Sequence, residues 1–248
     1  MFRVDGRVAL VTGAGRGIGA TIAEFLAAAG AEVILVSRSA ADLEAVAASI
    51  VGSGGCARVQ VCDVTDTTAI SALIEELSRL DILVNNAGKD TFEAFDEITE
   101  EDLDESLGLN TRAIFVVAQA GVKKMLQAPD RGGVVINISS QHGLVGLPNA
   151  ALHCMTKHAA EGLTKAMAVE LAPQRIRVNC IGPTFVQTPS TTIAAGTTAK
   201  QDAAVSKIPL GRLATVADVA AAAVYLASPA AAMVTGTCLR VDGGWTAQ

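Results

Sequence analysis

The segment TGAGRGIGA, residues 12–20, decides the fold, because it joins the apolar run RVALVT to a helical stretch. Gly13 permits a tight turn, Gly17 lets the backbone approach a pyrophosphate, and Gly19 lets the helix pack closely on the sheet. The N–H groups at the helix start and its positive dipole end would then hold the phosphate charge. A strand, this turn and a helix predict the first unit of a dinucleotide-binding domain. The predicted ligand contacts are Gly13, Gly15, Arg16, Gly17, Ile18 and Gly19.

Short apolar runs alternate with Ala-rich helical stretches along the whole chain. Runs of Val, Ile and Leu without polar alternation are typical of strands buried on both faces, and their alternation with helices predicts parallel crossovers. The predicted strands are 7–12, 32–37, 57–62, 81–85, 133–139, 176–181 and 238–242, and the predicted helices are 18–29, 40–51, 66–79, 102–127, 150–172 and 216–228. We expect one α/β domain over 1–248, a Rossmann-type, doubly wound, parallel seven-stranded sheet with helices on both faces.

One segment departs from this alternation. Residues 184–207, TFVQTPSTTIAAGTTAKQDAAVSK, are rich in Thr and small side chains. A long insertion near the carboxyl ends of strands in an open α/β sheet is more often a lid than a linker. We therefore predict a substrate lid at 184–207.

Composition narrows the class of protein. The 248 residues are 50% hydrophobic and 18% charged, which allows a sizeable core, and only 3% are aromatic. A net charge of −6 argues against a nucleic-acid partner. The sequence holds neither an apolar run of the ~20 residues that cross a bilayer nor a leader with a cleavage site. We expect a soluble cytoplasmic protein with no membrane partner.

The five cysteines are scattered and form no C-x-x-C pair. Such spacing indicates reduced thiols rather than a disulfide framework or a metal site. We predict no bound metal.

The end of the second predicted strand bears on the choice of coenzyme. An acidic residue there would bind the adenosine ribose and repel a 2′-phosphate, but this chain has Ser37 and Arg38, with Arg16 inside the glycine turn. Two guanidiniums suit a dianionic phosphate, which arginine clamps with paired hydrogen bonds. NADP is therefore favoured and NAD stays possible. In the alternative, either arginine is solvated or pairs with a surface carboxylate.

Further motifs follow in a fixed order. They are Asp63-Val64, Asn85-Asn86-Ala87-Gly88, Asn110 in GLNTRAIF, Ser140 at the end of NISS, RVNCIGP, and the closing VDGGW. Together with the T-G-x-x-x-G-I-G spacing of the glycine turn, this full-length order resembles the short-chain dehydrogenase/reductase family, in particular its 3-oxoacyl-ACP reductase and gluconate 5-dehydrogenase-like members. The resemblance implies an NAD(P)-dependent oxidoreductase that forms homotetramers or dimers.

The resemblance also implies which residues meet the coenzyme. Asp63 and Val64 would contact the adenine. Asn86, Ala87 and Gly88 would border the coenzyme on the central strand. In the segment IGPTFVQT, Pro183 and Thr188 stand where the family contacts the nicotinamide amide, and Val186 would also bind the coenzyme. Thr184 stands where the family usually has glycine.

The family's catalytic set is Asn, Ser, Tyr and Lys, and one member differs here. Asn110, Ser140 and Lys157 match, but the tyrosine position holds His153, thirteen residues after Ser140 and four before Lys157. The chain's single tyrosine, Tyr225, lies in a late helix, so it cannot replace the missing one. By resemblance, serine binds the substrate oxygen, lysine binds the nicotinamide ribose, asparagine holds a relay water, and His153 would exchange the proton.

Imidazole differs from phenol in its pKa and in how far its proton-exchanging atom extends from the backbone. Its ordinary pKa is about 6.5, against about 10 for phenol, and Lys157 with an oxidised nicotinamide disfavours the imidazolium. His153 would then be a neutral base near pH 7, and reduction would favour lower pH. Its Nε2 extends about 2 Å less than a phenol oxygen, a gap that a water could bridge. We expect weakened or pH-shifted interconversion of a secondary alcohol and a ketone. The alternatives are a pseudoenzyme that binds coenzyme without turnover and, less favoured, a non-redox lyase or epimerase.

The substrate itself is not specified by the sequence. The predicted pocket residues are Ser140, His142, Leu144, Val145, Leu147, Asn149 and Phe185. This mixture suits a modestly apolar alcohol or ketone, or a polyol with few polar anchors. His142 would contact substrate or face water, whereas His158, on another helix face, would be structural.

Overall fold

The computed structural model describes residues 2–129, 132–188 and 198–248. Within them a seven-stranded parallel sheet runs in the order β3-β2-β1-β4-β5-β6-β9. Its strands are β1 Val8–Thr12, β2 Glu32–Ser37, β3 Cys56–Val61, β4 Ile82–Asn85, β5 Gly133–Ile138, β6 Ile176–Pro183 and β9 Cys238–Val241. The predicted seven-stranded α/β sheet is confirmed, and its apolar runs supply all seven strands.

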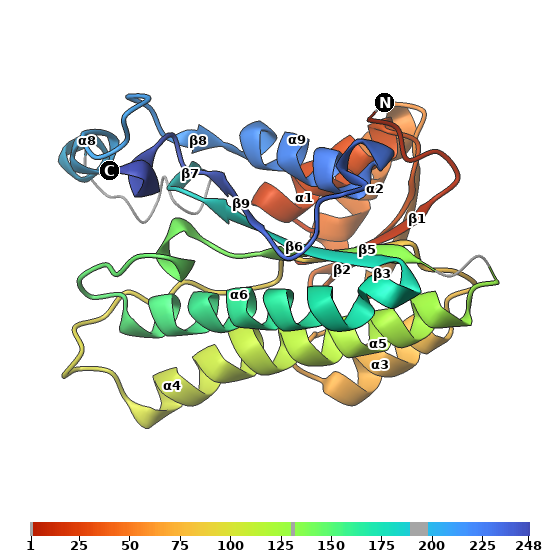
Figure 1. Ribbon diagram of the computed structural model, residues 1–248, viewed down its shortest axis with the longest axis horizontal. Coiled ribbons are helices and arrows are strands. Elements are labelled where there is room, and N and C mark those ends of the chain that lie inside the picture. Colours follow the sequence, from red (N-terminus) through yellow and green to blue (C-terminus); the bar gives the residue numbers. More distant parts are fainter. Residues whose placement is uncertain (1, 130–131, 189–197) are drawn as a thin grey trace.

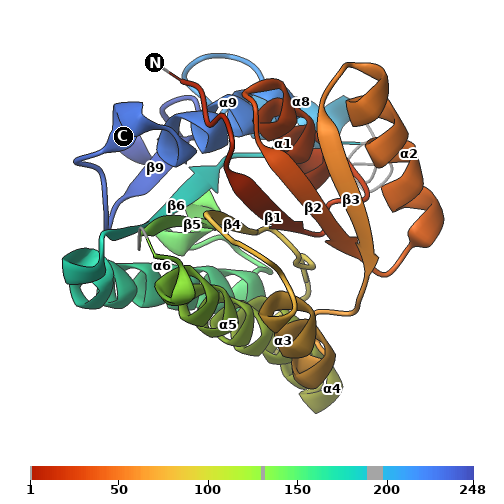
Figure 2. The ribbon, with the colours of Figure 1, turned by 90° about the vertical axis from the view of Figure 1, so that its right-hand side faces the viewer.

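Helices cover both faces of the sheet (Figure 1). One layer holds α1, α2 and α9, and the other holds α3, α4, α5 and α6, as Figure 2 also shows. Their bounds are α1 Gly17–Ala28, α2 Ala40–Gly52, α3 Thr67–Glu75, α4 Glu100–Leu107, α5 Ile114–Gln127, α6 Ala151–Leu171 and α9 Val216–Ala227. Each predicted helix is present.

The strand order indicates where a ligand would bind. From β1 the chain proceeds outward through β2 and β3, then crosses back to β4 on the other side of β1. In doubly wound sheets, ligands bind beyond the carboxyl ends of the strands at such a reversal. The glycine turn follows β1, so it lies at this point.

The core has two apolar layers because successive strand residues face opposite ways. Val11 and Leu35 pack under the α1 side, whereas Leu10 and Ile34 pack on the α3 and α5 side. All four are at most 1% exposed. Truncating any of them to alanine would cost about 2–5 kcal/mol, so this rigid sheet is a firm base for the loops at its end.

The long helix predicted at 102–127 is interrupted. It begins with α4, capped by Thr99 and Asp102, and then takes a π-helical turn over Gly108–Ala113 before α5. The apolar period of the sequence did not reveal this turn, because one widened turn barely changes the spacing of buried residues. π-Helical turns occur often at functional sites, and this one carries Asn110.

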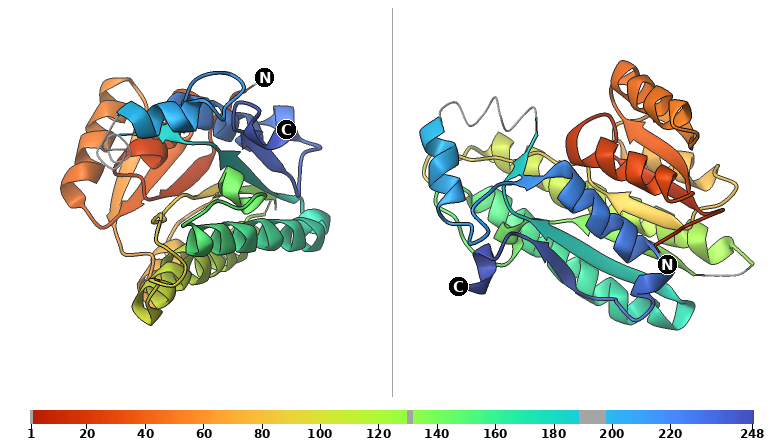
Figure 3. Two further views of the ribbon diagram at one scale, coloured as in Figure 1. Left: turned by 90° about the vertical axis from the view of Figure 1, so that its left-hand side faces the viewer. Right: turned by 90° about the horizontal axis from the view of Figure 1, so that it is seen from above.

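The predicted lid segment is partly described. Val186–Gln187 forms β7, which pairs with β8 at Ala214–Thr215, and α8 spans Thr198–Val205. Figure 3 shows α8 at the end of the molecule where β6 leads out of the sheet. Residues 189–197 lie outside the described residues, and the lid role stays a prediction. In the described ranges, no helix has the length and apolarity to span a bilayer.

Candidate active site

The glycine turn is shaped by close backbone approach. Gly13 has φ +65°, and a Cβ there would lie 2.8 Å from Asn86 Nδ2. A Cβ on Gly19 would lie 2.3 Å from the Gly13 carbonyl oxygen. Only glycine fits both positions, so the start of α1 can sit directly on the turn. Arg16, the N-cap of α1, makes no side-chain cap, and the first turn of α1 holds no acidic residue. This helix terminus therefore suits an anion.

The Asn86 segment holds the turn in place. Thr12 Oγ1 accepts hydrogen bonds from the N–H groups of Asn86 (3.0 Å) and Ala87 (3.1 Å). Asn86 Nδ2 donates to the carbonyl oxygens of Thr12 (3.0 Å) and Gly13 (3.2 Å). The N-N-A-G motif after β4 thus fixes the phosphate-binding turn after β1.

Residues after β2 and β3 surround the far end of this crevice. Arg38 is 81% exposed, and its Nη1 lies 3.7 Å from Asp63 Oδ2. Asp63 Oδ1 also accepts from the backbone and hydroxyl of Thr65, and these bonds, the backbone one foremost, lower the pKa of Asp63 against the effect of burial. The long, exposed Arg38–Asp63 pair leaves the guanidinium free to turn toward a ligand.

The sequence analysis missed a carboxylate here. A Cβ on Gly15 would lie 2.9 Å from Asp42 Cβ and 3.1 Å from Ser37 Oγ, so these three residues share one corner. Asp42 lies in the first turn of α2, whose N-cap is Ser39. The S-x-x-D capping pattern could have placed Asp42 at this helix start. Its negative charge opposes part of the attraction that the arginines exert on a phosphate.

Asn110 and Lys157 converge on Gly88. Asn110 Oδ1 accepts from the Lys89 N–H (3.0 Å), and its Nδ2 donates to the Lys89 carbonyl (2.7 Å). A Cβ on Gly88 would lie 3.1 Å from Asn110 Oδ1 and 3.9 Å from Lys157 Nζ. In this structure Asn110 therefore clamps the loop after β4, a role that the resemblance did not imply. Lys157 is buried, and burial lowers its pKa although the Asp90 charge acts the other way.

Ser140 and His142 form a small hydrogen-bonded unit. The His142 N–H donates to Ser140 Oγ (3.1 Å), and His142 Nδ1 lies 3.5 Å from the same oxygen. His142 Nε2 lies 3.2 Å from Gln141 Nε2. An amide nitrogen only donates, so His142 Nε2 accepts and the ring proton resides on Nδ1. Ser140 then has its own O–H proton to direct at a substrate.

His142 is buried rather than facing water. It is 3% exposed, and burial, followed by the nearby charge of His153, lowers its pKa to about 4. At neutral pH the ring is uncharged. The water-facing alternative is therefore wrong, because the ring is enclosed among other side chains.

His153 meets a carboxylate that the sequence analysis did not identify. Its Nδ1 lies 3.0 Å from Asp90 Oδ1. The carboxylate is out of line with the ring N–H, so Nδ1 has a close ion-pair contact without an aligned hydrogen bond. His153 is only 5% exposed, and Asp90 is 56% exposed.

Aromatic rings pack around His153 and His142. His153 packs against Phe92 (ring centroids 5.5 Å apart) and against His142 (5.7 Å). His142 also contacts Phe185 (5.9 Å) and Trp245 (6.2 Å). Phe185 was predicted, whereas Phe92 and Trp245 were missed. The closing VDGGW motif held the signal for Trp245.

The remaining predicted residues lie around this cleft to different degrees. Thr188 is adjacent to the glycine turn, since a Cβ on Gly17 would lie 3.7 Å from its Cγ2. Pro183 ends β6 and Val186 is buried in β7. In the loop before α6 Leu147 is half-buried and Asn149 exposed.

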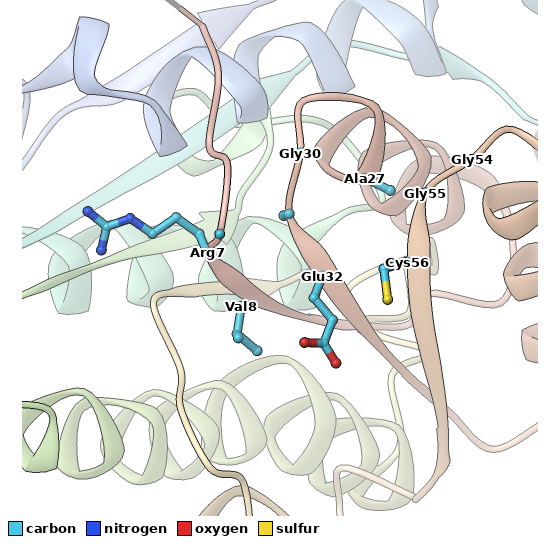
Figure 4. Close-up of a pocket in the computed structure, with 10 residues that line it drawn as sticks. Arg7, Val8, Ala27, Gly30, Glu32, Gly54, Gly55 and Cys56 are labelled. Carbon is cyan, nitrogen blue, oxygen red and sulfur yellow. The ribbon is translucent and has the colours of Figure 1, made fainter.

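The described residues hold no cluster of His, Cys, Asp and Glu that could bind a metal ion. A separate hollow of about 300 Å³ lies at the amino ends of β1, β2 and β3, away from the glycine turn (Figure 4). Its charged side chains already have partners, because Arg7 contacts Asp81 at 2.9 Å and Glu32 contacts Arg58 at 2.6 Å. The candidate site remains the group of side chains at the carboxyl ends of the strands.

A doubly wound parallel sheet with a glycine cradle at its reversal is typical of dinucleotide-binding α/β proteins. The chain belongs to the short-chain dehydrogenase/reductase family: the family model described as enoyl-(acyl carrier protein) reductase matches residues 13–246.

Similar proteins support this membership over the full length. An L-xylulose reductase from Bos taurus is 42% identical over 99% of each chain. A D-threitol dehydrogenase from Mycolicibacterium smegmatis is 41% identical over 99% of this chain and 95% of its own. A solved gluconate 5-dehydrogenase from Burkholderia cenocepacia, in complex with NADP and tartrate, is 34% identical with a TM-score of 0.94, covering 100% of this chain and 98% of its own.

Proposed function

We propose that the protein is an NADP(H)-dependent oxidoreductase that interconverts a secondary alcohol and a ketone on a short polyol or ketose. One observation supports the proposal: the ring of His153, 3.0 Å from Asp90, packs on that of His142, which is hydrogen-bonded to Ser140, and Lys157 lies one turn along the same helix. Such a cluster supplies a hydrogen-bond donor, a cation and a proton-exchanging group, which hydride transfer at a carbinol carbon requires.

The coenzyme fits the residues present. The turn at Gly13 and Gly19 leaves a cradle that side chains would fill, and the start of α1 suits a pyrophosphate. Arg16 and Arg38 would hold the 2′-phosphate. The similar gluconate 5-dehydrogenase was solved with NADP, which supports the same preference here.

The substrate class is inferred from the names of the similar proteins and from two buried polar atoms of this chain. The names of the similar proteins, L-xylulose reductase, D-threitol dehydrogenase and gluconate 5-dehydrogenase, all denote short polyhydroxylated compounds. In this chain Gln141 Oε1 and Thr184 Oγ1 are buried without a hydrogen-bond partner. Buried polar atoms are normally paired, so a hydroxylated substrate would satisfy them. The rings of Phe185 and Trp245 would pack on its C–H faces.

The residues of this chain would divide the work as follows. NADP(H), when bound beside these residues, would supply the hydride chemistry. During alcohol oxidation His153 Nε2 takes the hydroxyl proton, and during ketone reduction it returns a proton to the forming alkoxide. The Ser140 hydroxyl donates to the same oxygen, and the Lys157 ammonium stabilises negative charge near it.

We also propose a homotetramer in the reducing cytoplasm. Helices α5 and α6 expose Phe115 (50%), Met155 (44%) and Val169 (81%), apolar surface that a second copy would cover. The five free cysteines suit a reducing compartment.

The test is a screen of C4–C6 ketoses and polyols with NADPH or NADP, and with NADH or NAD, from pH 5 to 10. The wild type and His153→Tyr are assayed in parallel. We expect turnover with at least one ketose–polyol pair and a preference for NADP(H). Coenzyme binding without turnover at any pH would instead indicate a pseudoenzyme. Substrate conversion without net change in nicotinamide would indicate a lyase or epimerase.

A further inference from the structure

We propose that Asp90 is the positioning residue for His153: it fixes the ring proton on Nδ1 and leaves Nε2 to exchange the substrate proton. The inference rests on the proposed function for its role in turnover. The Asp90–His153 contact would thereby replace the tyrosine that the family has at this position.

The loop that carries Asp90 is held at both ends. Lys89, its immediate neighbour, is clamped through its N–H and carbonyl by Asn110. Farther along, Glu93 forms a parallel bridge with Ala150, the residue that precedes α6. Since His153 lies in the first turn of α6, the same bridge ties the Asp90 loop to the element that carries the histidine. Phe92, between the two anchors, packs on the His153 ring at 5.5 Å.

The charges around the ring favour a carboxylate partner. Among the described residues, the titratable groups that face His153 are Asp90 from the loop after β4, His142 from the turn after β5, and Lys157 one turn along α6. His142 is neutral at pH 7, and Lys157 opposes a positive imidazolium. Lys89 is engaged by Glu105 at 2.6 Å. Asp90 is therefore the group that offsets Lys157 when His153 receives a proton.

The contact with His153 also affects the pKa of the Asp90 carboxylate. Partial desolvation acts to raise the pKa of Asp90, but the His153 contact and the charges of His153, Lys157 and His142 outweigh it, so the net pKa lies below its ordinary value. Asp90 is thus ionised at neutral pH. An anion at Nδ1 selects the Nδ1–H tautomer, because only that form can donate to it.

The contact is close in distance but not aligned. Asp90 is 56% exposed, so its carboxylate has room to rotate into line with the ring N–H when a substrate closes the cleft. Hydrogen bonds that orient catalytic groups are often poorly aligned without ligand and tighten in the complex.

The test compares Asp90→Asn and Asp90→Glu in two backgrounds, wild type and His153→Tyr, with Asp96→Asn as a control carboxylate on the same connection. In the wild-type background, Asp90→Asn removes support for the imidazolium. We expect its kcat to fall at least 10-fold. The pH limbs for oxidation and reduction should both move to lower pH, because the protonated ring has lost its neighbouring anion. Asp90→Glu should recover part of the rate, and Asp96→Asn should match the wild type.

The His153→Tyr background separates positioning from a merely structural role. A carboxylate beside a phenol raises the phenol pKa, so removing Asp90 there should leave the rate unchanged or raise it. A structural role would lower the rate in both backgrounds, and that outcome would overturn the inference.

A second measurement does not depend on turnover. Nitrogen-detected NMR of the imidazole should find the Nδ1–H tautomer in the wild type and a larger share of the Nε2–H tautomer in Asp90→Asn. An unchanged tautomer would overturn the inference even if the enzyme is active. A different outcome is that the wild type turns over no substrate while NMR finds the expected tautomers. The proposed function would then be wrong, but the role of Asp90 in orienting His153 would be supported.

Discussion

Lys157 Nζ donates a hydrogen bond to the carbonyl oxygen of Ile138 over 3.0 Å, so the central lysine of α6 is tied to the last residue of β5. Its side chain is 8% exposed, and burial lowers its pKa. This bond points the ammonium toward Gly88, where the loop after β4 meets the cleft. The position of the charge is therefore set by the sheet rather than by a mobile side chain.

Replacing this lysine tests whether the charge matters beyond the fold. Lys157→Gln keeps a donor for the Ile138 carbonyl but removes the cation, so the fold should survive while kcat falls by about 100-fold or more. Steady-state kinetics and circular dichroism check the two parts. Lys165→Gln, an exposed lysine on the same helix, should behave as the wild type. Retention of full activity by Lys157→Gln would remove the lysine from the mechanism.

The choice of coenzyme should depend on Arg38. Its guanidinium is 81% exposed and only loosely paired with Asp63, so a 2′-phosphate can recruit it. Arg38→Ala should weaken NADPH binding by about 10-fold to 100-fold and leave NADH binding nearly unchanged, since a bidentate phosphate contact is lost. Calorimetric titration with both coenzymes measures the ratio. The control is Arg58→Ala, which breaks an ion pair with Glu32 at the other end of the strands. Equal losses for NADPH and NADH would contradict the assignment.

Acid stability should depend on Asp81, at the start of β4. This buried carboxylate accepts hydrogen bonds from Arg79, from Arg7 (2.9 Å) and from the Val8 N–H (2.9 Å). Desolvation acts to raise its pKa, but these bonds hold the pKa below the ordinary value. In the unfolded chain the pKa of Asp81 is about 3.9, so at any pH above this value the ionised carboxylate stabilises the folded state. As the pH falls through the lower pKa of the folded state, the carboxylate is protonated and this stabilisation is lost.

Asp81→Asn should therefore lower the free energy of unfolding by about 2 kcal/mol at pH 7, because charge-assisted bonds to the arginines are lost. Below pH 4 the difference from the wild type should shrink. Urea unfolding at pH 7 and at pH 3 measures both values. Asp5→Asn, an exposed carboxylate near the N-terminus, is the control. A constant difference at both pH values would show that the ionised carboxylate is not the cause.

Sequence reasoning succeeded where a residue's role is set by local pattern. The strands follow from unbroken Val, Ile and Leu runs, and the glycine turn from its place between strand and helix. It missed the π-helical turn at Asn110, because one widened turn hardly changes the apolar period. It also missed Asp90, Phe92 and Trp245, whose contacts depend on the paths of loops that no periodicity describes.

The glycine turn offers the sharpest test of the coenzyme cradle, because two glycines differ only in their surroundings. In Gly19→Ala the new methyl would lie 2.3 Å from the Gly13 carbonyl oxygen and 2.4 Å from Asn86 Nδ2, so the turn must move. We expect a loss of stability of about 1–3 kcal/mol and loss of NADPH binding. Gly52→Ala, the control at the end of α2, meets nothing within 4 Å and should be neutral or slightly stabilising. Thermal unfolding and NADPH fluorescence measure both effects. If Gly19→Ala binds NADPH as the wild type does, close contact between α1 and the turn is not what holds the pyrophosphate site.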